Sequence, residues 1–359
     1  MIRGHGGNIY ALAESLGCPV DAIIDMSSNV NPLGPPPGLL DHLQNHLNLI
    51  RALPEVDAGA AVRRFAKHFD IAANQVLAGN GTTQLIYALP RALETRLALI
   101  VGPSYADYHD GCRQNQADSA YWLTREGEAF QPDFEAMEGL LAPCDTVYIC
   151  NPNNPTGVLV EGEVLRRLSW NFPEKTFVVD ESYLPFVTTP EQWSLMAERP
   201  DNVVVLHSMS KIFRIPGLRI GFMVGDPALI ERMQSFSLPW SVNSLALEAV
   251  QYLLEPNEGI DRFVLETRRL LTDEKAAMTR RLSAIPGIRL FPSATGFFLV
   301  RLPDPHRSQA VCRRLAQKKI LVRDCANFTG LSDRFIRISL QTRAMNEKCT
   351  KALEAVLTT

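Results

Sequence analysis

The sequence predicts an α/β fold in which helices cover a mostly parallel sheet, with a smaller α+β domain beside it. Between residues about 75 and 225, short apolar runs rich in β-formers alternate with helix-like stretches. Continuous apolar runs of this length suit strands that are buried on both faces, as parallel strands usually are. The expected strands are residues 97–101, 146–150, 176–180, 203–207 and 219–224.

The C-terminal third has a different pattern, which predicts the smaller domain. A long helical stretch is expected over residues 243–284. Strand-like segments follow at 296–302, 319–323 and 334–340, with helical spacing at 308–317 and 346–357. The proline-rich segment at 31–38 cannot form a regular helix or the hydrogen bonds of a β-sheet. The residues before it should therefore form an arm that docks on another part of the protein. The predicted organisation is an arm at 1–40 that joins the small domain, a large domain at 41–247 and a small domain at 248–359.

The composition describes an ordinary globular protein. A length of 359 residues favours two domains, and 21% charged residues with a net charge of -3 give no bias toward polyanions, so nucleic acid is not an expected partner. Seven cysteines without a Cys-x-x-Cys pair argue against a disulfide framework or a structural zinc site, and no metal is predicted. The sequence shows no signal-peptide core and no membrane-spanning stretch, which predicts a cytoplasmic protein that binds no membrane.

A lysine with two neighbouring hydroxyls follows the fourth expected strand. Ser208, Ser210 and Lys211 are followed eight residues later by Arg219. An amine can form a Schiff base with an aldehyde, and hydroxyls with a guanidinium can hold a phosphate. Pyridoxal 5'-phosphate (PLP) carries an aldehyde and a phosphate on one ring, so this pattern predicts PLP as the cofactor.

Other polar or aromatic residues near the ends of expected strands can serve the ring of that cofactor. Asp180 can keep the pyridine nitrogen protonated, because a close carboxylate favours the charged form. Asn154, in Asn-Pro-Asn-Asn-Pro-Thr-Gly, and Tyr183 can donate hydrogen bonds to the phenolic oxygen. Tyr105 can stack on the ring face.

A glycine-rich turn precedes the helix-like run at residues 84–92. Gly81, Thr82 and Thr83 would open that helix, and free amides at a helix start favour a phosphate. Each motif alone is weak, because such sequences are also common turns, helix caps and surface segments. Their succession along strands of one sheet favours a single crevice at the carboxyl ends of those strands.

These motifs together resemble the fold-type I PLP enzymes of the aminotransferase class I and II family, over nearly the whole chain. The resemblance implies that Lys211 carries the cofactor and that Asp180, Asn154 and Tyr183 contact its ring. It also implies a stacking ring and phosphate ligands, which are Tyr105, Ser208, Ser210 and Arg219.

Two arginines on neighbouring expected strands point to the substrate. Arg337 resembles the family arginine that pairs with a substrate carboxylate, and Arg323 suggests a second anionic group. This pair resembles histidinol-phosphate aminotransferases and L-threonine-O-3-phosphate decarboxylases, whose substrates carry a phosphate. The N-terminal His-Gly-Gly-Asn arm and the Asn31 segment look more like the decarboxylases, which implies that His5, Gly6 and Asn31 help bind substrate.

The resemblance therefore favours PLP-dependent decarboxylation of L-threonine O-3-phosphate to (R)-1-amino-2-propanol O-2-phosphate, which supplies the cobalamin nucleotide loop. Histidinol-phosphate transamination and L-serine O-phosphate decarboxylation stay open as alternatives.

A homodimer is expected. Relatives usually place a tyrosine before a proline to reach the partner subunit's cofactor phosphate, but this chain has Leu53 there. Either another group replaces that hydrogen bond or the phosphate has one contact fewer.

Overall fold

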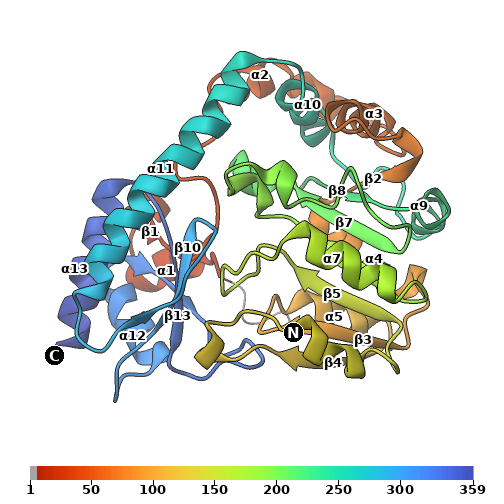
Figure 1. Cartoon of the computed structure of the whole chain (residues 1–359). Coiled ribbons are helices and arrows are strands. Elements are labelled where there is room, and N and C mark those ends of the chain that lie inside the picture. Colours follow the sequence, from red (N-terminus) through yellow and green to blue (C-terminus); the bar gives the residue numbers. More distant parts are fainter. Residues whose placement is uncertain (1–5, 359) are drawn as a thin grey trace.

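The large domain is built on a seven-stranded sheet. A computed structural model, which describes residues 6–358, gives the strand order β2-β8-β7-β6-β5-β3-β4 (Figure 1). Only β8 runs antiparallel to its neighbours, so the mostly parallel sheet is confirmed. The strands are β2 (Val76–Gly79), β3 (Leu97–Gly102), β4 (Asp118–Leu123), β5 (Thr146–Cys150), β6 (Thr176–Asp180), β7 (Val203–Ser208) and β8 (Gly221–Val224).

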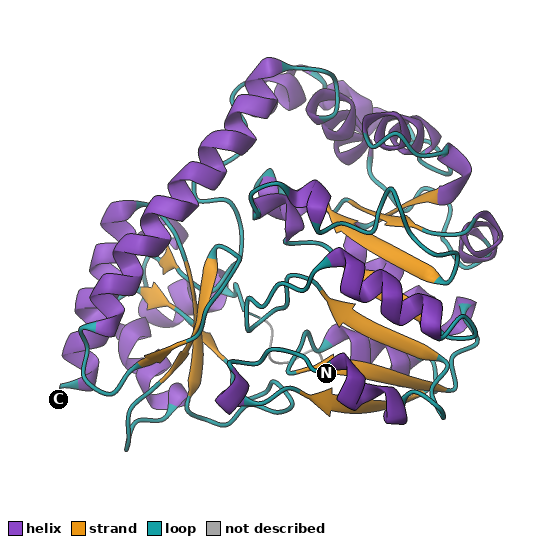
Figure 2. Ribbon diagram, viewed as in Figure 1, coloured by secondary structure: helices purple, strands orange, loops and turns teal. Residues whose placement is uncertain are grey.

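Helices cover both faces of this sheet, which explains the continuous apolar runs (Figure 2). In β3, Ile100 packs with the helices of one layer, whereas Leu99 belongs to the core on the other side. Successive strand residues point to opposite faces, so both must be apolar when both faces are buried. The first layer comprises α4 (Gly81–Ala92), α5 (Asp107–Gln114) and α9 (Pro227–Gln234), and the second includes α3 (Gly59–His68) and α7 (Gly162–Asn171).

The small domain has an antiparallel sheet of order β12-β13-β10-β9. Its strands are β9 (Arg289–Leu290), β10 (Phe297–Arg301), β12 (Arg323–Asp324) and β13 (Phe335–Ser339), and its helices are α11 (Glu258–Ser283), α12 (Ser308–Gln317) and α13 (Arg343–Leu357). The N-terminal arm contains α1 (Ile9–Leu16) and β1 (Ile24–Asp25). Because β1 pairs in parallel with β11 (Ile320–Leu321), the arm is joined to this domain.

One expectation about a helix is corrected. The helical stretch expected at 243–284 is two helices, α10 (Ser244–Leu253) and α11, because Pro256 in the connection cannot donate a helical hydrogen bond. The predicted domain limits at 40 and 247 fall inside α2 (Leu39–Asn45) and α10. These two helices pack on each other within one core, and the domain limits themselves stay a prediction.

Two strands of the large sheet gave no clear signal in the sequence. β4 lies at the sheet edge and has no fully buried side chain, so it lacks a continuous apolar run. β2 is only four residues long. None of the helices between residues 6 and 358 combines the length and hydropathy that crossing a membrane requires.

Candidate active site

The carboxyl ends of the parallel strands meet at one pocket. All eleven predicted cofactor residues line it: Gly81, Thr82, Thr83, Tyr105, Asn154, Asp180, Tyr183, Ser208, Ser210, Lys211 and Arg219. The wall also contains Tyr108, Cys150 and Ser182, which have no role predicted from the sequence. Parallel strands end at the same sheet edge, so segments far apart in the chain converge there. The individual roles of these residues stay predictions.

One end of the pocket has the features of an anion cradle. Gly81 begins α4 with a φ of +71°, and a Cβ atom there would lie 2.5 Å from Nη2 of Arg219. The guanidinium therefore lies against the first turn of the helix. Ser208 and Ser210 are buried beside it, at the start of α8 (Met209–Ile212). Helix amides, two hydroxyls and a guanidinium are suitable ligands for a phosphate.

Another part of the pocket contains a carboxylate that accepts hydrogen bonds from uncharged donors. Asp180 is buried, and its Oδ1 accepts a hydrogen bond from the Ser182 amide at 2.9 Å. Its Oδ2 accepts a hydrogen bond from the Tyr108 hydroxyl at 2.8 Å. These bonds orient the carboxylate without neutralising it, so its charge can stabilise a protonated pyridine ring. The anion cradle, this carboxylate and Lys211 in one pocket fit PLP.

Lys211 lies in α8, directly after β7. Burial lowers the pKa of its amine to about 8, and repulsion from Arg219 and Arg337 acts in the same direction. Asp180 opposes the shift. An ordinary lysine is almost fully protonated at neutral pH, whereas a pKa near 8 leaves a usable fraction of neutral, nucleophilic amine.

A second pocket adjoins the first and is formed by the arm and the small domain. It shares Tyr105, Asn154, Tyr183 and Lys211 with the cofactor pocket. The residues that line this pocket also include Gly6, Gly7, Asp25, Asn29, Arg214, Arg323 and Arg337. A Cβ atom on Gly6 would lie 3.2 Å from Cδ of Arg323, so the arm packs closely on that side chain. His5 lies outside the described residues.

The two predicted substrate arginines are direct cross-strand partners in β12 and β13. Arg337 is buried and donates to Oδ1 of Asn154 and, at 2.6 Å, to the carbonyl oxygen of Ser27. Arg323 donates to Oδ1 of Asn327 at 2.7 Å. Within residues 6–358, neither guanidinium forms an ion pair with a carboxylate. Two adjacent cations without a counterion form a favourable site for an anionic substrate.

Asn31 is a predicted substrate residue that lies apart from both pockets. It is completely buried and lines neither pocket. Its side-chain amide donates to the carbonyl oxygen of Ile212 at 2.8 Å and to Oγ1 of Thr267 at 2.7 Å, while its backbone N–H donates to the Lys211 carbonyl oxygen at 3.0 Å. With its donors occupied, Asn31 anchors the arm to the Lys211 segment, and its contact with substrate stays a prediction.

Asn29, two residues earlier, faces the pocket instead. Its Nδ2 donates to the Tyr183 hydroxyl at 3.2 Å, and its Oδ1 accepts from Ser339 at 2.6 Å. The Tyr183 hydroxyl therefore accepts a hydrogen bond from the arm, and its own proton stays available for donation to another group. Burial raises the pKa of the Tyr183 hydroxyl to about 12, which keeps it a hydrogen-bond donor.

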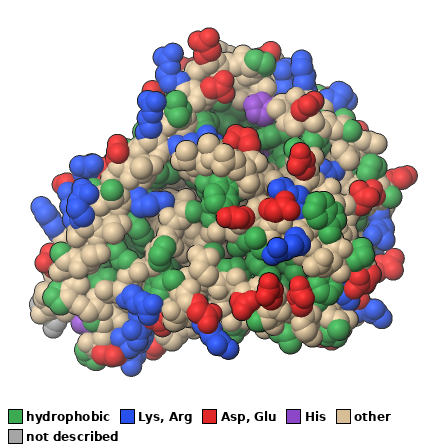
Figure 3. Space-filling view, in the orientation of Figure 1, with side chains coloured by type: hydrophobic (Ala, Val, Ile, Leu, Met, Phe, Trp, Pro, Cys, Tyr) green, Lys and Arg blue, Asp and Glu red, His purple; other side chains and the backbone are tan. Residues whose placement is uncertain are grey.

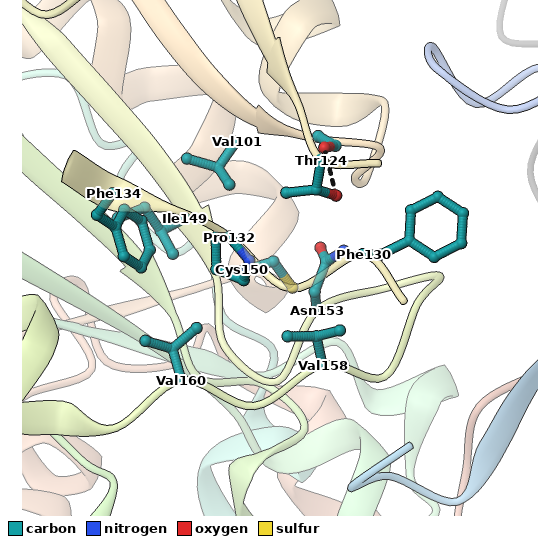
Figure 4. Close-up of a pocket in the computed structure, with 11 residues that line it drawn as sticks. Val101, Thr124, Phe130, Pro132, Phe134, Ile149, Cys150, Asn153, Val158 and Val160 are labelled. Atoms are coloured by element: carbon teal, nitrogen blue, oxygen red, sulfur yellow. Dashed lines mark hydrogen bonds between the residues drawn. The ribbon is translucent and has the colours of Figure 1, made fainter. Parts of the chain in front are cut away.

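A third cavity, shown in Figure 4, lies behind the Asn-Pro loop and is mostly apolar. Thr124 closes one side by donating to the Gly102 carbonyl oxygen at 3.1 Å. Asn153 also lines the cavity, and its amide donates to the Pro103 carbonyl oxygen at 2.9 Å. Burial raises the pKa of the Cys150 thiol in this wall, so the thiol stays protonated, as expected for an unreactive cysteine.

The comparisons with known proteins agree with this geometry. The model of the family "Aminotransferase class I and II" matches residues 21–356. The chain belongs to this aminotransferase class I and II family. It is 33% identical to the threonine-phosphate decarboxylase of Salmonella typhimurium, over 99% of this chain and 96% of that protein. It is 25% identical to the histidinol-phosphate aminotransferase of Methanocaldococcus jannaschii, over 96% of this chain and 92% of that protein.

Two solved structures are similar to this chain over most of its length. The L-threonine-O-3-phosphate decarboxylase from Porphyromonas gingivalis is 32% identical, with a TM-score of 0.83 over 94% of this chain and 100% of that chain. The histidinol-phosphate aminotransferase from Clostridium acetobutylicum has a TM-score of 0.85 at 24% identity, over 94% of this chain and 99% of that chain. The second similarity concerns the fold alone. The fold-type I architecture predicted from the motifs is confirmed.

Cofactor uptake by this family member should depend on pH through Lys211. The neutral amine is the form that reacts with an aldehyde, and burial lowers the pKa of Lys211 to about 8. Below that pH the neutral fraction falls about tenfold per pH unit, and above it the fraction levels off. We expect the rate at which apoprotein gains visible absorbance with PLP to rise from pH 6 and to level off above about pH 8. A rate that keeps rising to pH 10 would contradict the lowered pKa.

The Tyr108→Phe variant should weaken catalysis by this family member without removing its cofactor. It deletes one of the two hydrogen bonds that orient Asp180, and a hydrogen bond to a charged group contributes about 1.5–3 kcal/mol. We expect kcat to fall roughly tenfold, with a shifted pH dependence of the absorbance of bound PLP. Tyr148→Phe is the matched control, because Tyr148 stacks on Tyr108 at 5.2 Å and its change leaves both Asp180 bonds in place. Equal effects in the two variants would indicate a packing role only.

Proposed function

We propose that this chain is a PLP-dependent carboxy-lyase that converts L-threonine O-3-phosphate into (R)-1-amino-2-propanol O-2-phosphate for the cobalamin nucleotide loop. One observation carries the proposal. Among residues 6–358, the substrate pocket is lined by Lys211, Arg214, Arg323 and Arg337 but by only one carboxylate, that of Asp25. Such an excess of positive charge suits a substrate with both a carboxylate and a phosphate. The 33% identity to a threonine-phosphate decarboxylase over nearly the whole chain supports the same substrate.

PLP, when bound, withdraws electrons from the substrate Cα, and the protein directs this chemistry. Asp180 would hold the pyridine nitrogen, while Asn154 and Tyr183 would donate to the phenolic oxygen. The amide of Asn154 is oriented for this, because its Oδ1 is occupied by Arg337 and its NH2 group remains as the donor. The phosphate ligands would be Gly81, Thr82, Thr83, Ser208, Ser210 and Arg219.

The two arginines would set the reaction by orienting the substrate. Arg337 would hold the carboxylate, and Arg323 would hold the phosphate together with Gly6 and His5 of the arm. The bond that breaks is the one held perpendicular to the cofactor ring, so the carboxylate position decides between decarboxylation and proton removal. Lys211, in the same pocket, would deliver a proton to Cα after carbon dioxide leaves.

The reaction itself can be tested directly. Enzyme loaded with PLP should release carbon dioxide from L-threonine O-3-phosphate without any added 2-oxoacid. L-serine O-phosphate lacks one methyl group, and such a difference in a pocket changes kcat/KM by roughly 10- to 200-fold. Turnover that instead requires 2-oxoglutarate and converts histidinol phosphate with formation of pyridoxamine phosphate would overturn the proposal.

A homodimer is the proposed assembly, supported by one group of exposed apolar side chains. The segment from α2 to residue 56 and the loop at 238–240 meet where the Trp240 amide donates to the Val56 carbonyl oxygen at 3.0 Å. The large apolar side chains exposed there are Leu40, Leu47, Ile50, Leu53, Val56, Leu238 and Trp240. Leu53 is 75% exposed, and apolar surface gathered in this way is typical of subunit interfaces. Light scattering at micromolar concentration would test the dimer.

We also propose a cytoplasmic location. All seven cysteines are free thiols, which suits a reducing compartment. The face in Figure 3 carries acidic and basic side chains interspersed, without a continuous basic area. That pattern supports a small-molecule partner over nucleic acid on this face.

A further inference from the structure

A cluster of two histidines and a glutamate lies between α2 and α10, at residues that the cofactor and substrate pockets do not use. Nε2 of His42 is 2.7 Å from Oε1 of Glu248, and Nε2 of His46 is 3.8 Å from the same oxygen. All three side chains are partly exposed, with 23–39% of their surface accessible. It is the one group of potential metal ligands of this kind within residues 6–358.

The histidine pair has the spacing of metal ligands, and His46 also has the required tautomer. Residues four apart lie on the same side of a helix, and the ring centroids of His42 and His46 are 4.3 Å apart. Nδ1 of His46 contacts the carbonyl oxygen of His42 at 2.8 Å, and a carbonyl can only accept, so Nδ1 carries the proton. In the neutral ring, Nε2 then presents its lone pair toward Glu248. A backbone carbonyl bonded to the other ring nitrogen is a common feature of histidines that bind metals.

The distances are close to those of a transition-metal site. Bonds of about 2.0–2.2 Å in tetrahedral geometry place neighbouring ligand atoms roughly 3.3 Å apart. The ligand atoms here all lie within 4.8 Å of one another, and the two distances to Glu248 fall on either side of the ideal value. Small rotations of partly exposed side chains can complete the site. Metal binding at Nε2 of His42 requires the other neutral tautomer, in which the proton that is now donated to Glu248 lies on Nδ1 instead.

We propose that His42, His46 and Glu248 form a binding site for a divalent transition cation of the Zn²⁺ class, with water as the fourth ligand. Two imidazoles and one carboxylate favour such a cation over Mg²⁺, which prefers oxygen ligands. The cation joins α2 to α10 across 206 residues of sequence, so it stabilises the large domain at that junction. The cysteine pattern predicted no metal, and the histidine pair gave no signal because Glu248 is remote from it in the sequence.

The test is calorimetric titration of Zn²⁺ into untagged, PLP-loaded protein that has been treated with a chelator and desalted. We expect one Zn²⁺ per chain and no binding of Mg²⁺. His46→Gln and Glu248→Gln should each weaken Zn²⁺ binding at least roughly tenfold, since changes even to groups behind a ligand cost 10- to 100-fold. His109→Gln is the matched control, a helical histidine bonded to Ser119, and it should bind as the unmodified protein does.

Thermal unfolding separates a metal site from damage to the fold. Without metal, the His46→Gln protein should unfold near the temperature of the unmodified protein and keep its activity. Added Zn²⁺ should raise the unfolding temperature of the unmodified and His109→Gln proteins, but not that of His46→Gln. No Zn²⁺ binding by the unmodified protein would overturn the proposal. Undiminished binding by both site variants, or loss of binding in His109→Gln, would also overturn it.

Discussion

The Lys211→Ala variant is expected to lose both turnover and the visible absorbance of the cofactor-loaded protein. Lys211 is the amine in the cofactor pocket, and burial lowers its pKa to about 8 so that it can react with an aldehyde. Alanine has no amine that could bind the cofactor covalently or carry a proton to the substrate, so kcat should fall by at least roughly 10³-fold. Carbon dioxide release from L-threonine O-3-phosphate and the absorption spectrum after dialysis against PLP measure the two effects.

Lys275→Ala provides a matched control for this variant. Burial also lowers the pKa of Lys275 to about 8, but its Nζ donates to the Ser293 carbonyl oxygen at 2.8 Å and it lines neither described pocket. The Lys275→Ala protein should keep its colour and its activity. Persistence of either property in the Lys211→Ala protein would show that another group carries the cofactor.

The Arg323→Gln variant is expected to lose recognition of the substrate phosphate. Charged hydrogen bonds contribute about 1.5–3 kcal/mol each, so kcat/KM for L-threonine O-3-phosphate should fall roughly 10- to 100-fold, mainly through KM. Any slow reaction of L-threonine, which has no phosphate, should change little. This difference between substrates distinguishes a binding role from general damage, and steady-state kinetics with both amino acids measures it.

Arg301→Gln is the control for the second variant. Arg301 lies on β10 of the same sheet, but it is partly exposed and pairs with Glu126 at 3.3 Å, away from the substrate pocket. We expect normal kinetics from this control. Equal losses for L-threonine and its phosphate in Arg323→Gln would indicate that Arg323 supports the fold of the pocket and does not contact the phosphate.

Much of the large domain could be predicted from local sequence. β5 (Thr146–Cys150) and β6 (Thr176–Asp180) have the predicted bounds, because central parallel strands must be apolar on both faces. The edge strand β4 could not be recognised in this way, since half-exposed strands tolerate polar residues. The prediction of a single helix at 243–284 did not take Pro256 into account. This proline interrupts the helix, although the apolar spacing on either side of it is helical.

The sequence by itself determined eleven of the residues that line the cofactor pocket, because each belongs to a short motif at or near a strand end and parallel strands end together. Only the tertiary structure decided which remote groups support those residues. Tyr108 donates to Asp180, and Asn29 lines the substrate pocket and donates to Tyr183. Such contacts depend on which way a side chain points from a loop or helix. That direction is set by packing between distant segments, which local sequence patterns do not record.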